Sequence, residues 1–259
     1  MTAHTPLADS GTVSSFVAGG IADVSFGHPK SNSLPASVLS ALAEQISALG
    51  ARNDVRVVVL RSYGTGAFCA GASFDELAAI RDAAAGKEFF MGFARVILAM
   101  TRCPKPIITR VHGKVVGGGV GVVAASDYAM ATDKAALRLS ELAVGIGPFV
   151  VGPVIEHKIG AGAFGPMAID ADWRDAAWGE RHGLYARMFD TIDALDAAIG
   201  VFARKLADAN PDAVARIKAI TWAGRDNWPR LLEERAAMSG TLVLSDYTRN
   251  AIAGFGGRS

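Results

Sequence analysis

The sequence has little cysteine, no excess of one charge and no long apolar run. Its 259 residues include only two cysteines, Cys69 and Cys103, too few for a disulfide framework and outside any C-x-x-C or Cys/His cluster. A net charge of +1 gives no reason to expect a nucleic-acid or membrane-surface partner. Apolar runs end well before the roughly 18 residues of a membrane span. The N-terminus, MTAHTPLADSGT, lacks the pattern of a signal peptide. We expect a cytoplasmic protein without a bound metal.

Glycine and small apolar residues, by contrast, are abundant and recur in a pattern. Val55–Leu60 is β-branched and predicts a strand buried on both faces, followed by a glycine-bearing loop and helical segments from about 74 to 100. The order then repeats, with a strand at Pro106–Val111, a glycine loop and a small-residue helix that begins at Val120 and ends at Asp127. Two units of strand, glycine loop and helix therefore lie about fifty residues apart, as an α/β fold would place them.

Shorter patterns complete the expected element order. Two apolar runs flank Gly19-Gly20 and predict a hairpin, and Pro35–Leu49 has the spacing of an amphipathic helix ended by Gly50. The remaining predicted strands are Tyr128–Ala131 and Ala136–Leu139. The predicted C-terminal helices are Val150–Ile159, Asp172–Arg181, Ile192–Ala209, Pro211–Ala223 and Trp228–Asn250.

Both glycine loops place small residues immediately before a helix. They are GAFCAGASFDEL, Gly66–Leu77, and VHGKVVGGGVGVVAASD, Val111–Asp127. The first N–H groups of a helix have no intrahelical acceptor, and glycine lets a ligand approach the backbone closely. Two such helix starts could each direct one N–H at the same oxygen, which is the construction of an oxyanion hole.

A dinucleotide site is an alternative for the second loop. Gly119 to Ala124 satisfies the pattern G-x-G-x-x-A, and Glu141 follows about twenty residues later, where such a fold carries an acidic residue. A dinucleotide fold should continue as alternating strands and helices, whereas the chain beyond Glu141 is expected to be mainly helical. An NAD(P)-dependent oxidoreductase therefore stays open as a second hypothesis.

Taken together, these loops, HPKSNSLP (His28–Pro35) and LRLSELAVGIGP (Leu137–Pro148) resemble the enoyl-CoA hydratase/isomerase, or crotonase, superfamily over nearly the whole chain. The resemblance implies an α/β fold, a crotonase-like spiral of repeated ββα units at 1–190 with a helical C-terminal region at 191–259. That region would cover the acyl pocket and make the contacts of a homotrimer or hexamer. The implied substrate is an acyl-CoA thioester, with coenzyme A as part of the substrate and no further cofactor.

The resemblance also implies the roles of individual residues. Ala72, which follows Cys-Ala-Gly, and Gly118, the middle glycine of the triplet, would donate their N–H groups to the thioester oxygen. Coenzyme A would lie near Lys30, Ser33, Ala70 and Phe74. Gly119 and Gly121 would also line the substrate site.

Hydratases of this family typically use two glutamates, and the resemblance places only one here. The first position is occupied by Gly121, and the second matches Glu141, whose neighbours are apolar. An apolar environment can raise the pKa of a carboxyl group toward neutrality, which suits proton transfer. Glu156 and His157 could supply a second group if their helix faces the cavity, whereas His112 fits a structural role.

The sequence therefore predicts an acyl-CoA enzyme in which Glu141 moves a proton beside an oxyanion hole. Syn addition of water to a 2-enoyl thioester is best served by two carboxylates, whereas one suffices to isomerise a 3-enoyl to a 2-enoyl thioester. Both reactions stay open, so the enzyme is expected to be a lyase or an isomerase. The lost glutamate also leaves open a non-catalytic acyl-CoA-binding protein.

Overall fold

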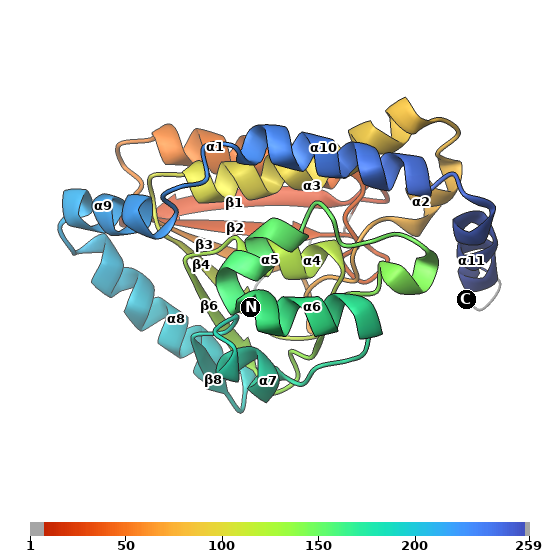
Figure 1. The fold of residues 1–259 in the computed structure, drawn as a ribbon. Helices are drawn as coiled ribbons and strands as arrows, with labels where there is room; N and C mark the ends of the chain where they lie inside the picture. The colour runs from red at the N-terminus through yellow and green to blue at the C-terminus, as the bar shows by residue number, and fades with distance from the viewer. Residues whose placement is uncertain (1–7, 257–259) are drawn as a thin grey trace.

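The computed structural model describes residues 8–256, so most of the stretch on which the signal-peptide argument rests lies outside it. Its main sheet has six strands in the order β1-β2-β3-β4-β6-β8, as Figure 1 shows in part. The predicted hairpin is confirmed as β1 (Thr12–Ala18) and β2 (Ile21–Gly27), which pair antiparallel. All other pairings in this sheet are parallel, through β3 (Val57–Ser62) and β4 (Ile107–Val111).

Helices cover both faces of this sheet. On β3, Val58 and Leu60 join the larger core, whereas Val57 and Val59 pack with residues of α8 in a second cluster. The side chains of a strand alternate between the two faces of the sheet. The continuous apolar run of β3 is therefore buried on both faces, as predicted. α1, α3 and α10 lie together along one side of the molecule and α8 lies apart from them (Figure 1). The bounds are α1 (Ala36–Ala51), α3 (Ala83–Arg102), α8 (Ile192–Ala207) and α10 (Trp228–Leu242).

A second, two-stranded sheet and several short elements form the end of the molecule where the glycine loops meet. β5 pairs parallel with β7, and isolated bridges join Leu34 to Ala72 and Cys69 to Val115. These pairings connect the two glycine loops to each other and to the HPKSNSLP turn. The short elements are α2 (Phe74–Ala79), β5 (Val115–Val116), α4 (Gly118–Ala124), β7 (Leu137–Arg138) and the 3-10 turn η1 (Leu142–Val144).

The C-terminal part is mainly helical, but two of its predicted helix boundaries are wrong. α7 starts at Ala176 rather than Asp172, because Asp175 caps it by accepting the N–H of Trp178 at 2.6 Å. The predicted final helix is two helices, since the chain turns after α10 and Ser245 accepts the N–H of Thr248 at the start of α11. This C-terminal part also contains a helix and a strand that the sequence did not predict, α6 and β8. The bounds here are β6 (Tyr128–Thr132), α5 (Gly152–Ile159), α6 (Ala161–Asp170), α7 (Ala176–Arg181), β8 (Arg187–Phe189), α9 (Pro211–Thr221) and α11 (Asp246–Gly256).

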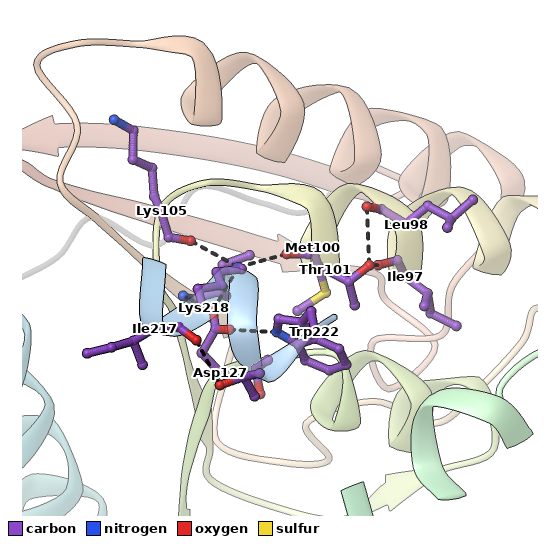
Figure 2. Close-up of polar contacts among 12 residues, drawn as sticks. Ile97, Leu98, Met100, Thr101, Lys105, Asp127, Ile217, Lys218 and Trp222 are labelled. Atoms are coloured by element: carbon purple, nitrogen blue, oxygen red, sulfur yellow. Dashed lines mark hydrogen bonds and ion pairs between the residues drawn. The ribbon is translucent and has the colours of Figure 1, made fainter. Parts of the chain in front are cut away.

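A buried ion pair fastens α9 to the turn between α4 and β6. Figure 2 shows Lys218 donating to the carbonyls of Met100 and Lys105, at 2.9 and 3.0 Å, and to the carboxylate of Asp127 at 2.7 Å. Trp222 donates its indole N–H to the other carboxylate oxygen at 2.8 Å. A buried charge is tolerated only when it is paired and hydrogen-bonded, and here all three lysine donors are used. The network thus fixes the end of the helix that begins at the glycine triplet.

Candidate active site

A small cavity of about 60 Å³ lies between the two glycine loops. Its walls also include α3, the segment after η1 and one residue of α10, and most of them are apolar. Among the described residues that line it, only Ser140, Glu141 and Ser239 have polar side chains. The apolar side chains include Leu77, Phe90, Phe93, Val144, Ile146 and Val150. A group inside this cavity is therefore largely removed from water.

The first wall is the loop before α2. Gly71 has φ +94°, and its carbonyl accepts the N–H of Leu34 at 2.8 Å. That contact belongs to the bridge between Leu34 and Ala72, and the N–H of Ala72 has no acceptor among residues 8–256. Ser73 then caps α2 by accepting the N–H of Glu76 at 3.4 Å. The loop thus brings one unpaired backbone donor to the cavity wall.

The second wall is the glycine triplet. Gly117 has φ +53° and ψ −123°, a conformation that side chains disfavour, and its N–H donates to the carbonyl of Arg138 at 2.8 Å. Gly118 begins α4, and a side chain there would overlap the ring of Phe93. No residue in the described part of the chain accepts the N–H of Gly118. Both residues predicted to form the oxyanion hole therefore line one cavity and have unpaired N–H groups.

Glu141 lies against the same triplet. Its Oε1 is 3.3 Å from the position that a Cβ of Gly117 would occupy, and its Oε2 is inaccessible to solvent and unpartnered within the described structure. Burial raises the pKa of this carboxyl from 4.5 to about 7, although the backbone N–H groups of Glu141 and Ser140 act in the opposite direction. The residue as a whole is half-buried, but it is the inaccessible oxygen that determines the pKa. Such a group can accept and release a proton near neutral pH.

Gly119 and Gly121 do not line this cavity. Gly119 lies inside α4 and packs against Cys69, whose Cβ would be 2.7 Å from an added Cβ. The Cβ of Gly121 would be 2.6 Å from Cγ1 of Val151, so that valine occupies the place where a larger side chain would begin. Close packing accounts for both glycines of the G-x-G-x-x-A pattern. The structure leaves no open approach there for a pyrophosphate.

The four residues predicted to lie near coenzyme A divide into two pairs. Ala70 and Phe74 line the cavity. Lys30 is exposed on the surface, where its ammonium group pairs with Asp75. The hydroxyl of Ser33 is buried 3.0 Å from Nδ1 of His28, away from the cavity.

The other titratable groups considered from the sequence lie elsewhere. Glu156 is exposed on α5, and His157 packs on Trp222 with ring centroids 4.9 Å apart. His112 is buried edge-to-face against Phe68, and burial lowers its pKa to about 4. None of the three lines the cavity, so Glu141 has no second titratable side chain beside it among the described lining residues.

Sequence reasoning missed the two hydroxyl groups of the cavity. Ser140 could have been found, because it adjoins Glu141 in the same segment. Ser239 gave no signal, because it lies about a hundred residues away in a helix that was expected only to cover the pocket. Its place depends on how α10 packs on α3.

Two features are not found in residues 8–256. They contain no cluster of three or more His, Cys, Asp and Glu that could hold a metal ion. None of the helices in this range combines the length and the apolar character of a membrane span.

Comparisons with known proteins show which family and which fold this chain shares. Residues 17–255 match the family described as Enoyl-CoA hydratase/isomerase. The chain is 31% identical over 191 residues to a (7aS)-7a-methyl-1,5-dioxo-2,3,5,6,7,7a-hexahydro-1H-indene-carboxyl-CoA hydrolase of Mycobacterium tuberculosis, covering 73% of this chain and 74% of that protein. It is 27% identical to carnitinyl-CoA dehydratase of Salmonella arizonae, covering 88% and 93%. The crystal structure of enoyl-CoA hydratase from Bacillus halodurans superposes with a TM-score of 0.86 at 17% identity, covering 93% and 99%, and shows the shared fold.

Proposed function

Because the chain belongs to the enoyl-CoA hydratase/isomerase family, an acyl-CoA enzyme superfamily with the crotonase fold, we propose that this cavity isomerises an enoyl-CoA thioester. The observation that carries the proposal is the pairing of one buried carboxyl, Glu141, with two unpaired N–H groups in one apolar cavity. The enzyme relatives of this chain include hydrolases, dehydratases and isomerases, so the reaction has to be argued from the site itself.

The thioester carbonyl receives hydrogen bonds from the N–H groups of Ala72 and Gly118. Removing a proton from the carbon next to this carbonyl places negative charge on its oxygen. Fixed backbone donors in an apolar cavity stabilise that charge without having to reorganise, and each is worth a rate factor of about 100 to 1,000. The cavity walls exclude water, which strengthens both hydrogen bonds.

Glu141 moves the proton. Its ionised form takes the proton from C2 of a 3-enoyl thioester, and its neutral form returns a proton to C4, so that the double bond moves into conjugation with the carbonyl. The same carboxyl acts as base and then as acid, and no water is consumed. A pKa of about 7 suits both steps, because both protonation states are accessible near neutral pH.

The packing at Gly121 favours isomerisation over hydration. A second carboxylate that positions water would belong on this stretch of α4, and Val151 fills the adjoining space. Val151 also lines the cavity, so the surface facing the substrate on that side is apolar. A proton shuttle by one carboxyl needs nothing more from that wall.

The direct test is a panel of short 2-enoyl-, 3-enoyl- and 3-hydroxyacyl-CoA thioesters assayed for product. We expect turnover of the 3-enoyl thioester, a rate lower by orders of magnitude for Glu141→Gln, and nearly unchanged thioester binding. Equal activity of wild type and Glu141→Gln would refute the role of Glu141. Water addition to the 2-enoyl thioester as the fastest reaction would show a hydratase instead.

A non-catalytic acyl-CoA-binding protein is the alternative that the single carboxylate supports. It predicts that all three thioesters raise the thermal midpoint and that none is converted. The same thermal screen with NAD(P) tests the oxidoreductase hypothesis, for which we expect no shift.

For assembly we keep the homotrimer or hexamer that the resemblance implies, and for localisation the cytoplasm that the composition led us to expect. Exposed apolar side chains on α8 and α9 support self-association, since Val201, Ile217 and Ile220 are 73%, 65% and 76% exposed. Light scattering after size-exclusion chromatography tests this, and a monomer would refute it. Coenzyme A would extend from the cavity toward Lys30, which is on the surface.

A further inference from the structure

We propose that Ser239 of α10 is a specificity-determining residue, whose hydroxyl binds an oxygen atom on the acyl chain of the substrate. The inference rests on the proposed function, because it takes the cavity to be the acyl site. It adds the substrate class: an acyl chain that carries a hydroxyl or carbonyl oxygen rather than a plain hydrocarbon.

Ser239 is a buried residue whose hydroxyl is unused within the described structure. The residue is 1% exposed and lines the cavity. Its hydroxyl makes no hydrogen bond with any residue of the described structure. A hydroxyl that is unused by the protein and borders a cavity can form a hydrogen bond with a ligand there.

Other helical hydroxyl groups of this protein behave differently. Those of Ser47, Thr101, Thr221 and Thr241 donate to the carbonyl four residues earlier, at 2.8 to 3.1 Å. This back-bonding is the usual way for a helical serine or threonine to satisfy its hydroxyl. Ser239 lies in a helix of the same kind, and its hydroxyl does not bond back. The hydroxyl of Ser239 is therefore available to a group bound in the cavity that this residue lines.

Close packing of α10 on α3 brings Ser239 to this position. Gly86 of α3 and Gly240 of α10 are in backbone contact, since a Cβ on Gly86 would be 2.7 Å from the carbonyl oxygen of Gly240. The ion pair between Lys87 and Glu233, at 2.6 Å, holds the two helices in register. A side chain at either glycine would push the helices apart and withdraw Ser239 from the wall.

The two hydroxyl groups of the cavity lie on different elements. Ser140 adjoins Glu141, and its Oγ is 3.7 Å from the Cβ position of Gly117, beside the carbonyl site. Ser239 comes from α10, together with the α3 wall that carries Phe90 and Phe93. Apart from Ser140 and Glu141, Ser239 therefore supplies the only polar side chain that an acyl chain could contact among the described lining residues.

The test compares thioesters that differ only in this oxygen. Dissociation constants of 5-hydroxyhexanoyl-CoA, 5-oxohexanoyl-CoA and hexanoyl-CoA, whose oxygen lies outside the reacting carbons C2 to C4, are measured by calorimetry in the Glu141→Gln background, so that none is converted. We expect the oxygenated thioesters to bind more tightly than hexanoyl-CoA. Ser239→Ala should remove about two- to twelvefold of that preference, the worth of one hydrogen bond, while hexanoyl-CoA binding stays nearly constant.

Two further variants separate hydrogen bonding from packing. Ser239→Cys keeps the side-chain size with a much weaker hydrogen bond and should lose the preference as Ser239→Ala does. Thr241→Ala, an exposed hydroxyl that bonds back on the same helix, should change no dissociation constant. Thermal midpoints show that each variant is folded.

The outcomes distinguish the inference from the proposed function. If hexanoyl-CoA binds as tightly as the oxygenated thioesters, or if the preference survives both Ser239 variants, Ser239 has no such role and the isomerase proposal is untouched. If no thioester binds at all, the proposed function itself is wrong.

Discussion

Replacing Glu141 by glutamine should abolish turnover and at the same time stabilise the fold, by an amount that depends on pH. Burial raises the pKa of Glu141 from 4.5 to about 7 in the folded protein. In the unfolded chain the carboxyl is hydrated and titrates near its ordinary value. Glutamine fits the same space without a charge, so it avoids the cost of ionising a buried group.

The sign and size follow from proton linkage. Below pH 4.5 both states are protonated and the carboxyl does not disfavour folding. As pH rises toward 7, the unfolded chain releases a proton that the folded chain still holds, so wild-type stability falls until the folded carboxyl also ionises. The full loss is about 3 kcal/mol, at about 1.4 kcal/mol for each pH unit between the two pKa values. Between pH 5 and pH 8 the advantage of Glu141→Gln should therefore grow by roughly 2 to 3 kcal/mol.

Urea unfolding at fixed protein concentration measures this difference at both pH values, and fixing the concentration excludes effects of self-association. Glu156→Gln, at an exposed position on α5, is the matched control and should show no comparable growth. If the advantage of Glu141→Gln is the same at pH 5 and pH 8, the carboxyl is not perturbed by burial, and the proton-shuttle argument loses its basis.

Three further predictions test the packing of the fold and of the site. Gly118→Ala should destabilise the protein by about 1 to 3 kcal/mol in urea unfolding and abolish turnover, because its side chain overlaps the ring packed on the triplet. Lys218→Met should lower stability by about 3 to 5 kcal/mol, since it leaves the carboxylate of Asp127 buried without its cation; an unchanged thermal midpoint would contradict this. Gly121→Ala should be destabilising alone and tolerated together with Val151→Ala, so a double-mutant cycle should give a clear coupling energy, and additive effects would show that the two residues are not in contact.

The features of the candidate site that depend on local backbone chemistry could be predicted from the sequence, and the roles of its residues stay predictions. The backbone conformation of Gly117 disfavours a side chain, and at Gly118 a side chain would overlap the ring of Phe93. Both constraints appear in the sequence as consecutive glycines. Glu141 could be predicted because it is an isolated acid in an apolar segment. The carry-over of Lys30 and Ser33 from the family remains a prediction, since neither lines the cavity.

The parts that could not be predicted depend on contacts between distant segments. Ser239 reaches the cavity because Gly86 and Gly240 let α10 pack closely on α3, and neither glycine marks such a contact in its own neighbourhood. The break between α10 and α11 depends on a serine cap inside a stretch with continuous helical character. The division of the chain at residue 190 likewise remains a prediction, because nothing in the packing of these helices tests it.

Gly121 stands where hydratases of this family typically carry a glutamate, and its packing bears on the reaction. In the sequence it is a missing carboxylate, which weakens the case for a hydratase but leaves room for a water molecule or another polar group to take its place. In the structure that room does not exist, since Val151 packs against the glycine and presents an apolar surface to the cavity. Hydration by the two-carboxylate route would therefore need changes at both positions, because a glutamate at 121 alone would collide with the valine. The loss of one acid and the gain of a packed valine together favour chemistry that uses a single proton shuttle.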